Sequence, residues 1–407
     1  MPTTEITQSV SGDPHFRRLW VGYSVSAAGS AVGGTALPVV AVRDLHAGPL
    51  AVSVLAASGS TAALVLALPV GRWAEFRRKR PAMILSDVIR CLGLLSVPLA
   101  AVYGRLSLLQ LCVVAAVVAV GEVLFSAAAQ AQLIDLVSRA RIVDANGRLS
   151  ASTWLSLSVG PAVGGVIITA VGAVSTVLVD ALSYLASAIT IRLIRKPETP
   201  PSGQPVARDG GQVLFGLRFL LADPQLRRLA SSWMVFAGSA ALATPLASVF
   251  YLRQLHFSTW QYGLIMGVPA LAGFAGSRLT RRVVARWGAL VTVRRTSLLR
   301  ALPMLLTPLA GRGWVGVLLC GMAFAGLLFF SSLSNSALTG YRQLRTPDGL
   351  LVRVATSWSF AQRLAQSCVI LAGGALTEVI GLRAGLFGAA GGALVAALLV
   401  PRTGPAD

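Results

Sequence analysis

The sequence predicts an all-α integral membrane protein with twelve transmembrane helices, arranged as two six-helix bundles related by a pseudo-twofold axis. Of its 407 residues, 55% are hydrophobic and only 12% are charged, whereas soluble domains carry about 25% charged residues. Short polar segments separate apolar runs of about 20 residues, the length of a helix that crosses a bilayer core. The second half of the chain also repeats patterns of the first half, which is typical of a duplicated bundle.

Six apolar runs account for the first half of the chain. We expect transmembrane helices over Leu19–Val42, Ala51–Val70, Pro81–Val102, Leu106–Ala129, Leu149–Ala170 and Ala173–Ile194. The segment Met1–Pro14 before them is polar and lacks the apolar core of a signal peptide. The first helix is therefore expected to stay in the mature chain and to direct it to the membrane.

A segment rich in Pro, Gly and charge, Arg195–Gly211, interrupts the apolar runs after the sixth predicted helix. This composition indicates a linker. The predicted domains are an N-terminal bundle over residues 1–194, a cytoplasmic linker over 195–222 and a C-terminal bundle over 223–407. Helices of the second bundle are expected over Leu229–Leu252, Tyr262–Val284, Leu290–Ala310, Trp314–Leu333, Val354–Val379 and Leu382–Val400.

The basic residues are distributed unevenly among the predicted connections. Of the 35 Lys and Arg residues, 27 fall on the side of the termini, five on the opposite side and three within apolar runs. Because basic loops stay on the cytoplasmic side, both termini are predicted to be cytoplasmic. The net charge of +20 is divided among short clusters rather than gathered on one face, so we expect no nucleic-acid partner.

Nothing in the sequence indicates a metal site, a cofactor or an enzyme. The four cysteines lie singly in apolar runs and the three histidines are scattered, so no metal-binding spacing is present. The sequence has no phosphate-binding loop of the form G-x-x-x-x-G-K-[ST], so ATP is not expected as an energy source.

Short motifs carry the internal repeat. The segment Asp13–Leu19 matches Asp223–Leu229 at an offset of 210, and Arg148–Ser152 matches Arg353–Ser357 at an offset of 205. Parallel six-helix repeats joined by a cytoplasmic linker are the architecture of one large class of secondary transporters.

The loop between the second and third predicted helices resembles the signature of the major facilitator superfamily, in which a glycine and an acid precede a basic cluster. These positions are Gly71, Glu75, Arg77, Arg78, Lys79 and Arg80. Nearly the whole chain is similar to a bacterial subgroup of drug and siderophore exporters that includes macrolide-efflux and enterobactin-exporter-like proteins. The segments that carry this similarity are Phe16–Trp20, Ser86–Arg90, Asp144–Leu149, Gly160–Gly165 and Asp180–Tyr184.

The resemblance implies a monomeric, proton-coupled exporter of small amphipathic molecules, such as a drug, an antibiotic or a siderophore-like compound. It would work by alternating access in the bacterial inner membrane, with the substrate, protons and the lipid bilayer as partners. The alternatives are a non-transporting membrane scaffold or sensor on the same fold, and an importer or lipid transporter of the same superfamily. The chain departs from the family's pattern at Glu75, where Asp is usual, at Ser156, where Gly is usual, and in having no Arg on the fourth helix.

The basic loop is expected to form a cytoplasmic gate, in which Glu75 interacts with the dipole of the third helix and with nearby arginines. The alternative is that the cluster only fixes the topology. Asp87 and Arg90 are three residues apart on one helix face and are expected to pair. The expected gate residues are Gly71, Glu75, Arg77, Arg78, Arg80, Asp87, Arg90 and Arg148.

Small residues on the fifth predicted helix, namely Gly160, Pro161, Gly164 and Gly165, allow helices to approach closely, and the proline bends the helix. The antiporter resemblance implies a pliable, leak-tight interface between the halves at this place. The alternative is ordinary close packing.

Ionisable residues within apolar runs are candidates for function by default. Glu122, near the middle of the fourth helix, is expected to bind a proton or to face a cationic substrate; the alternative is a neutral packing residue. Asp180, Arg300 and Arg363 are further candidates for proton coupling or substrate binding. The alternative for Asp180 is a structural hydrogen bond near the outer rim. For the two arginines the options are snorkelling, pairing with an acid across the halves, or binding an anionic substrate. Trp154 and Trp358, at corresponding places in the two repeats, are candidates for lining a drug cavity, with packing or lipid contact as the alternative.

Overall fold

The computed structural model describes residues 13–75, 77–138, 141–198, 210–347 and 350–401. Within these ranges the regular structure is helical, and nine helices are long and apolar enough to cross a membrane. The chain is thus an all-α, multi-pass membrane protein, as predicted. The count of twelve spans stays a prediction, because the eighth and ninth predicted spans are broken into shorter helices and the twelfth has 17 residues.

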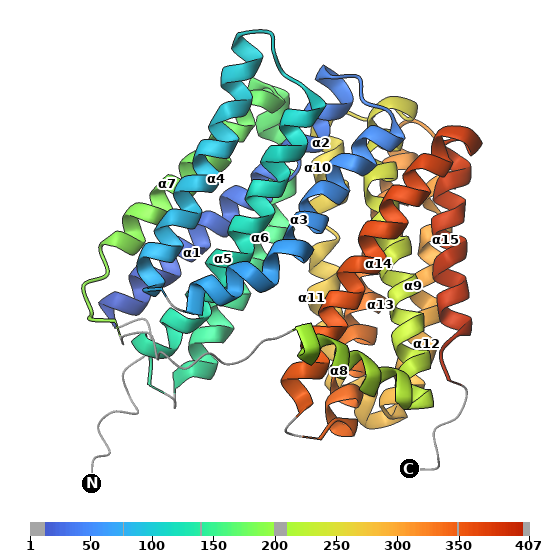
Figure 1. The fold of residues 1–407 in the computed structure, drawn as a ribbon. Coiled ribbons are helices and arrows are strands. Elements are labelled where there is room, and N and C mark those ends of the chain that lie inside the picture. The colour runs from blue at the N-terminus through green and yellow to red at the C-terminus, as the bar shows by residue number, and fades with distance from the viewer. Residues whose placement is uncertain (1–12, 76, 139–140, 199–209, 348–349, 402–407) are drawn as a thin grey trace.

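The N-terminal lobe contains helices α1 to α7 (Figure 1). Its elements are α1 Pro14–Gly33, α2 Ala36–Val39, the π-helix Val40–Asp44, α3 Pro49–Glu75, α4 Lys79–Val102, α5 Leu108–Leu136, α6 Ile142–Val171 and α7 Ala173–Arg192. α1 packs against α6 and α7, while α4 packs against α5 and α7. α6 begins seven residues earlier than expected, since the polar residues before Leu149 also become helical, with Asp144 in the first turn, where the helix dipole favours an acid.

The C-terminal lobe contains helices α8 to α15 (Figure 1). Its elements are α8 Gly210–Ala222, α9 Pro224–Val249, the π-helix Phe250–Gln254, α10 Thr259–Gly267, α11 Ala270–Trp287, α12 Ala289–Ala301, the 3₁₀ turns Leu302–Leu305 and Thr307–Leu309, α13 Trp314–Arg345, α14 Leu351–Ile380 and α15 Leu382–Leu398. α9 packs against α14 and α15, and α13 packs against α11 and α12.

The repeated Asp-Pro motif begins the first long helix of each lobe. The carboxylate of Asp13 accepts hydrogen bonds from the amides of His15 and Phe16, and that of Asp223 accepts them from Gln225 and Leu226. Each aspartate therefore caps its helix, and the following proline occupies the first turn, where its missing N–H is not needed. The sequence match at an offset of 210 is thus a repeated helix start.

The same two helices also end in the same way. The first leads through the short helix α2 into a π-helix and the second leads into one directly, and each π-helix is followed by a histidine with a positive φ, 54° at His46 and 58° at His256. The amide that follows each histidine bonds back into the π-helix, from Ala47 to Ala41 and from Phe257 to Tyr251. The two chain reversals meet where the lobes touch, so the repeat extends from the start of the helix to its end.

Breaks in the helices of the C-terminal lobe follow its prolines. The eighth predicted span divides into α10 and α11 at Val268–Pro269, and the ninth ends α12 at Ala301 before 3₁₀ turns that begin at Leu302 and Thr307. Pro303 and Pro308 are the second residues of these turns. A proline lacks the N–H that an α-helix uses, which explains the change to tighter turns.

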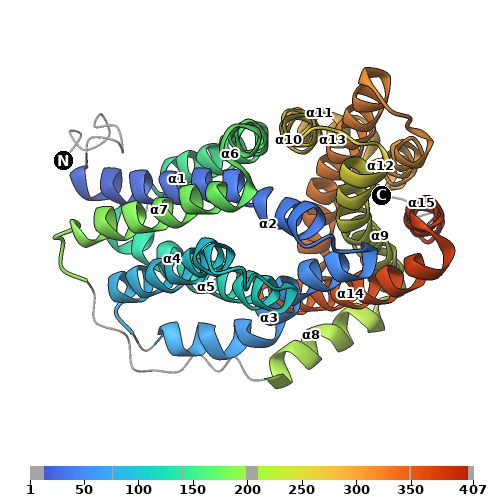
Figure 2. The ribbon, with the colours of Figure 1, turned by 90° about the horizontal axis from the view of Figure 1, so that it is seen from above.

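The predicted linker contains a helix that the sequence analysis did not foresee. α8 lies across the base of the C-terminal lobe, beside α14 (Figures 1 and 2). Leu220 is buried against the lobe, whereas Leu214, Phe215 and Leu221 are exposed. A helix with one packed face and one apolar exposed face fits the boundary of a membrane.

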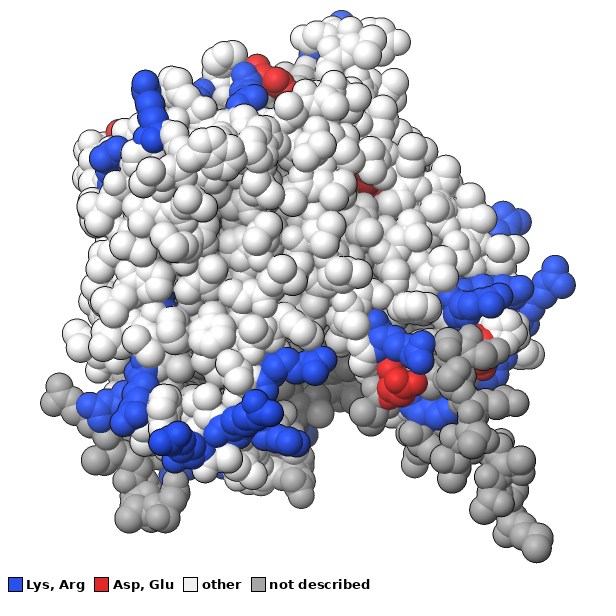
Figure 3. Space-filling view, turned by 180° about the vertical axis from the view of Figure 1, so that it is seen from behind, with Lys and Arg blue, Asp and Glu red and all other residues white. Residues whose placement is uncertain are grey.

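The two lobes contact each other along two pairs of helices, α3 with α14 and α6 with α10. Figure 2 shows these pairs on opposite sides of the molecule. Lys and Arg side chains gather at the end that carries both termini, where the surface is hollowed between the lobes (Figure 3). This is the end that the charge distribution predicts to be cytoplasmic.

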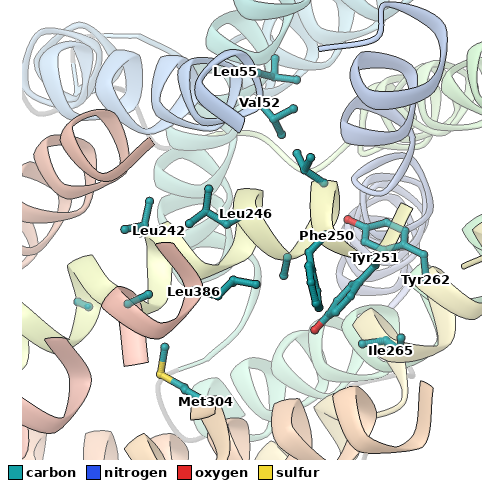
Figure 4. Packing of buried hydrophobic residues seen from close by; sticks show 14 of the residues in the cluster. Val52, Leu55, Leu242, Leu246, Phe250, Tyr251, Tyr262, Ile265, Met304 and Leu386 are labelled. Atoms are coloured by element: carbon teal, nitrogen blue, oxygen red, sulfur yellow. The ribbon is translucent and has the colours of Figure 1, made fainter. Parts of the chain in front are cut away.

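One hydrophobic cluster crosses from lobe to lobe at the opposite end. It joins Val52 and Leu55 of α3 to Leu246 and Phe250 of the α9 segment and to Tyr262 of α10 (Figure 4). A second cluster, around Phe16, Leu19, Met83 and Leu133, remains within the N-terminal lobe. Among the described residues, buried apolar side chains of the two lobes thus meet toward the predicted outer end.

Candidate functional site: a cavity between the lobes with a buried charge cluster

A cavity of about 600 Å³ lies between the lobes. Its walls come from α1, α3 and α6 on one side and from α9, α10 and α14 on the other. The lining is apolar apart from amide and hydroxyl groups, and none of its lining residues is charged. The polar lining residues are Ser30, Thr35, Ser60, Thr244, Ser248, Tyr262 and Gln366.

A smaller cavity of about 210 Å³ adjoins the large one inside the N-terminal lobe. The two share Ser30, Ala31 and Leu157 in their walls. The smaller cavity is also lined by Glu122, whose side chain is 59% exposed. The carboxylate predicted to be functional is therefore the charged group that the described residues present to this connected space.

Glu122 is anchored by an arginine from the neighbouring helix. Arg90 Nη1 of α4 donates to Glu122 Oε2 of α5 at 2.7 Å, while Arg90 Nη2 donates to Asp87 Oδ1 at 2.5 Å. Asp87 and Arg90 thus form the pair expected from their spacing, and both side chains are fully buried. The structure places this pair in the interior of the N-terminal lobe, beside Glu122, rather than in the basic loop.

Aromatic rings enclose the guanidinium of Arg90. Its Cζ lies 4.8 Å from the ring centre of Phe125 and 4.2 Å from that of Tyr184. Tyr184 Oη shares a hydrogen bond of 2.8 Å with Ser30 Oγ, which lines both cavities. A cation between two ring faces is stabilised where water is excluded.

Asp180 adds a third carboxyl to this region. It is buried on α7 and fills the space beside Gly33 of α1, and its Oδ1 has no hydrogen-bond partner within the described part of the chain. Asp87, Glu122, Asp180 and Arg90, which we call the N-lobe charge cluster, comprise three carboxyls and one guanidinium. Because one arginine cannot neutralise three carboxylates, the cluster is suited to holding a proton.

The C-terminal lobe has a buried arginine of its own. Arg300 of α12 is 1% exposed and donates to Ser334 Oγ at 3.2 Å. Its Cζ lies 3.6 Å from the ring centre of Phe236 and 5.1 Å from that of Trp233. The structure therefore places Arg300 inside the lobe, separate from the N-lobe charge cluster.

The other predicted membrane residues are not brought together. Arg363 is exposed on α14. Trp358 is buried beneath Arg342, whose Cζ lies 4.6 Å from the indole, whereas Trp154 is partly exposed on α6. Neither tryptophan lines the two cavities described above, so their role in a drug cavity stays a prediction.

The basic loop has acidic partners that sequence reasoning did not identify. Glu198 accepts hydrogen bonds from the amides of Lys79 and Arg80 at the start of α4 and pairs with the Arg80 side chain at 2.8 Å. Lys79 Nζ pairs with Asp135 of α5 at 2.5 Å. An acid four residues after the end of the sixth predicted span was the signal, since free amides at a helix start attract carboxylates.

The remaining gate candidates lie at the same end of the molecule. Arg77 and Arg78 are exposed, and Arg148 forms an i,i+4 ion pair with Asp144 at 3.5 Å. Gly71 lies in α3, but its surroundings and the side chain of Glu75 fall outside the described residues. The proposed latch through Glu75 stays a prediction.

The four small residues of α6 divide between two neighbours. A Cβ on Gly160 or Gly164 would meet α1 of the same lobe, whereas Gly165 faces α10 of the other lobe and Pro161 lines the large cavity. Residues four apart share a helix face, so 160 and 164 lie on one face and 161 and 165 on the next. Only the second face belongs to the contact between the lobes.

Polar contacts between the lobes, two of them to backbone groups, supplement the apolar packing at the outer end. Glu378 of α14 accepts a hydrogen bond from the amide of Leu50, at the start of α3, at 2.9 Å. Arg43, at the end of the first π-helix, donates to the carbonyl of Phe257 at 3.1 Å. Because the partners are backbone groups more than 200 positions away, no sequence motif could have revealed them.

Comparison with known proteins agrees with this geometry. The family model of the Major Facilitator Superfamily matches residues 19–368. The chain is 27% identical over 383 residues to the multidrug efflux pump Tap of Mycobacterium tuberculosis, covering 88% of this chain and 86% of the relative. It is 25% identical over 282 residues to the pump of the same name from Mycolicibacterium fortuitum, covering 65% and 68%.

Solved structures show the same fold. A bacterial homologue of the iron transporter ferroportin in an inward-facing state superposes with a TM-score of 0.77, at 14% identity, over 97% of this chain and 98% of that chain. The nucleoside transporter NupG superposes with a TM-score of 0.76, at 10% identity, over 94% and 97%. The chain belongs to the major facilitator superfamily and is a membrane transport protein, not an enzyme.

Proposed function

We propose that this transporter is a secondary active exporter, which moves small amphipathic molecules out of the cell in exchange for protons by alternating access. The observation that carries the proposal is the placement of Glu122. Its carboxylate lines the smaller cavity, which adjoins the cavity between the lobes, while it pairs with an arginine that is buried beside Asp87. A scaffold protein has no use for such an arrangement, because burying charge is costly.

The cavity supports an amphipathic substrate. Its volume of about 600 Å³ lies within the range of about 300–1,000 Å³ that is common for small-molecule sites. Its walls are apolar, with hydroxyl and amide groups from α1, α3, α9 and α14. Such walls favour a lipophilic body with a few polar groups over a sugar or an inorganic ion.

The relatives support export as the direction of transport. The lobes share a core toward the outer end, and the surface is hollowed at the basic end (Figures 3 and 4). In this facing, an exported substrate would enter from the cytoplasm or the inner leaflet. The efflux pumps to which the chain is 25% and 27% identical support export rather than uptake.

Proton coupling would work through the ion pair of Glu122. A proton on this carboxyl cancels the charge that holds Arg90 Nη1, and Arg90 then keeps Asp87 as its partner. Arg90 also contacts Phe125 of α5 and Tyr184 of α7. A movement of the Arg90 side chain would therefore alter its contacts with both helices. Each proton would in this way alter the wall of the cavity and the balance between the two facings.

We place the transporter in the bacterial inner membrane, with both termini in the cytoplasm. The 27 basic residues on the side of the termini support this orientation. A single chain supplies both lobes and all walls of the cavity, which supports a monomer as the working unit.

Transport in sealed vesicles tests the proposal. The wild type, Glu122→Gln and the control Asp144→Asn are reconstituted, and proton-driven flux of a panel of lipophilic and siderophore-like compounds is measured. Asp144 is an exposed carboxylate of α6, so its amide variant should transport like the wild type. We expect Glu122→Gln to lose the dependence of flux on the proton gradient.

Two outcomes would contradict the proposal. Equal gradient-dependent flux in wild type and Glu122→Gln would exclude Glu122 as the coupling residue. Flux of no compound, from protein that is folded and correctly oriented, would favour the scaffold alternative.

A further inference from the structure

The repeat places two arginines at equivalent positions of the lobes. Arg300 follows Arg90 by 210 positions, the offset of the Asp-Pro motifs, and Ser297 follows Asp87 by the same number. Each arginine lies within a bundle and contacts aromatic rings. In the N-terminal lobe the residue three positions before the arginine is its carboxylate partner, whereas in the C-terminal lobe that residue is a serine.

The C-terminal lobe has little acid with which to neutralise Arg300. No Asp or Glu occurs in the sequence from Pro224 to Pro347, which includes α9 to α13. Glu378 of α14 is used at the outer end, where it accepts from Leu50. Within the described residues Arg300 forms no ion pair, and its side chain contacts Ser334, Trp233 and Phe236.

Hydrogen-bonding groups near Arg300 are left without partners. Arg300 Nε, Ser297 Oγ and Ser331 Oγ are buried and have no hydrogen-bond partner among the described residues. Ser297 lies one turn before Arg300 on α12, and Ser331 lies on α13 near Ser334, which Arg300 contacts. Buried polar groups of this kind normally form hydrogen bonds, since leaving one without a partner costs about 1–3 kcal/mol.

A small cavity of about 40 Å³ lies about one turn along the chain from Arg300 and from Ser331. Its lining includes Met304 and Leu327, which lie four residues from Arg300 and from Ser331, but Arg300, Ser297 and Ser331 do not line it themselves. Hydroxyl groups of Thr244, Thr307 and Tyr251 also line this cavity, so part of its wall is polar.

We propose that Arg300, with the hydroxyls of Ser297 and Ser331, binds a small monovalent anion. The anion takes the place that the Asp87 carboxylate holds beside Arg90 in the other lobe. One guanidinium supplies one positive charge, and the rings of Trp233 and Phe236 provide apolar walls, so the site suits a single charge. The ligand is either free chloride or the carboxylate group of a substrate.

The binding test uses the full-length protein in detergent micelles and measures the unfolding temperature in sodium chloride, sodium acetate and sodium gluconate at equal ionic strength. Ligand that binds only the folded state raises this temperature. We expect chloride or acetate to raise it by about 3 °C relative to gluconate, which is too large for the site. This readout does not depend on transport, so it can fail while the proposed export function holds.

Two variants localise the site. Ser297→Asp supplies the missing carboxylate from within the chain, in the spacing of the Asp87–Arg90 pair, and is expected to remove the anion response while the protein stays folded. The control Arg295→Gln changes an exposed arginine of the same helix, which stacks on Trp287, and should keep the response. Arg300→Gln should also lose the response if it folds.

The salts distinguish the sources of the anion. A higher unfolding temperature in chloride indicates that the site binds a free halide. A higher unfolding temperature in acetate but not in chloride indicates that it binds a carboxylate of the substrate. Equal unfolding temperatures in all three salts would overturn the proposal. An anion response that persists unchanged in Ser297→Asp would overturn it as well, because the bound anion would then lie elsewhere.

Discussion

At the scale of single residues, the charges within the membrane segments differ between the lobes. In the N-terminal lobe Arg90 bridges Asp87 and Glu122, and Asp180 lies in the same bundle. In the C-terminal lobe Arg300 rests on aromatic rings. Since the backbone repeats and the acids do not, the duplicated bundles are suited to different ligands.

Replacing Arg90 should be among the most damaging changes within the membrane. Arg90→Met leaves Asp87 buried without its counter-charge, and breaking a buried pair in this way costs about 3–5 kcal/mol. Arg148→Met, which removes an exposed pair with Asp144, should cost at most about 1 kcal/mol. Thermal unfolding of the two purified variants measures the difference, and equal losses of stability would show that the Arg90 pairs contribute little.

Asp223 gives a residue-scale prediction about pH. Burial raises the pKa of its carboxyl, but hydrogen bonds from the amides of Leu226 and Gln225 and the charge of Arg345 outweigh burial and hold the pKa below its ordinary value of 3.8. A lowered pKa in the folded state stabilises the protein at pH values above that ordinary value. The stabilisation is lost as the pH falls through the lowered pKa.

The unfolding temperature of the wild type should therefore fall more steeply below about pH 4 than that of Asp223→Asn. Asparagine still caps a helix but has no carboxylate to protonate. Unfolding temperatures measured from pH 6 to pH 2 compare the two proteins, and parallel curves would contradict a role for the Asp223 charge.

At the scale of elements, α6 and α10 form the closest contact between the lobes. A Cβ on Gly165 would lie 2.5 Å from the carbonyl oxygen of Thr259 and 3.0 Å from the Cα of Gly263. No real Cβ is tolerated so near a backbone atom, so the two helices can meet only while these positions remain glycine. The contact thus sets how tightly the outer half can close.

Gly165→Ala should hold the outer half of the transporter apart. A cysteine introduced at Thr35, which lines the cavity, is labelled from outside with a membrane-impermeant reagent. We expect labelling to be about 5- to 150-fold faster in Gly165→Ala, since relieving a clash of this kind is worth about 1–3 kcal/mol. Gly147→Ala is the matched control on α6, because nothing lies within 4 Å of the added Cβ; equal rates in both variants would contradict the clash.

At the scale of the whole molecule, the structure shows one facing of the transporter. Apolar packing and polar contacts close the predicted outer end, and ion pairs of Lys79 and Arg80 hold the basic loop to its own lobe and to the segment that follows α7. Alternating access requires that the outer contacts break in the other facing. They are therefore the places where small changes should shift the balance between facings.

Removing Glu378 should favour the outward-open facing. Glu378→Ala loses the hydrogen bond to the amide of Leu50, whereas Glu378→Gln retains an oxygen that can accept it. A hydrogen bond to a charged group is worth about 1.5 kcal/mol or more when buried, and less at this exposed place, so we expect a shift of a few-fold up to about tenfold. Labelling of the cysteine at position 35 measures the shift, and a rate no faster than that of the glutamine variant would exclude this contact from the seal.

Local patterns in the sequence were sufficient for the class of fold. The apolar runs predicted helices that the structure contains, and the Asp-Pro motifs predicted equivalent positions, which proved to be N-caps at Asp13 and Asp223. The spacing of Asp87 and Arg90 predicted their pairing. The helix α8 was not predicted. It follows a segment rich in Pro and Gly, and that composition indicated a linker for the helix as well.

Membrane location and helical class followed from the sequence itself, because a bilayer demands long apolar runs and every helix satisfies its own backbone. The partner of Glu122, the isolation of Arg300 and the seal at Glu378 were decided only by tertiary structure. Each of these features involves a contact between residues at least 30 positions apart. Such contacts depend on how packed helices are rotated and how closely they approach, and no local pattern in the sequence specifies either. The sequence thus supplied the charges, and the packing of the two lobes decided which of them meet each other, the cavity or a ligand.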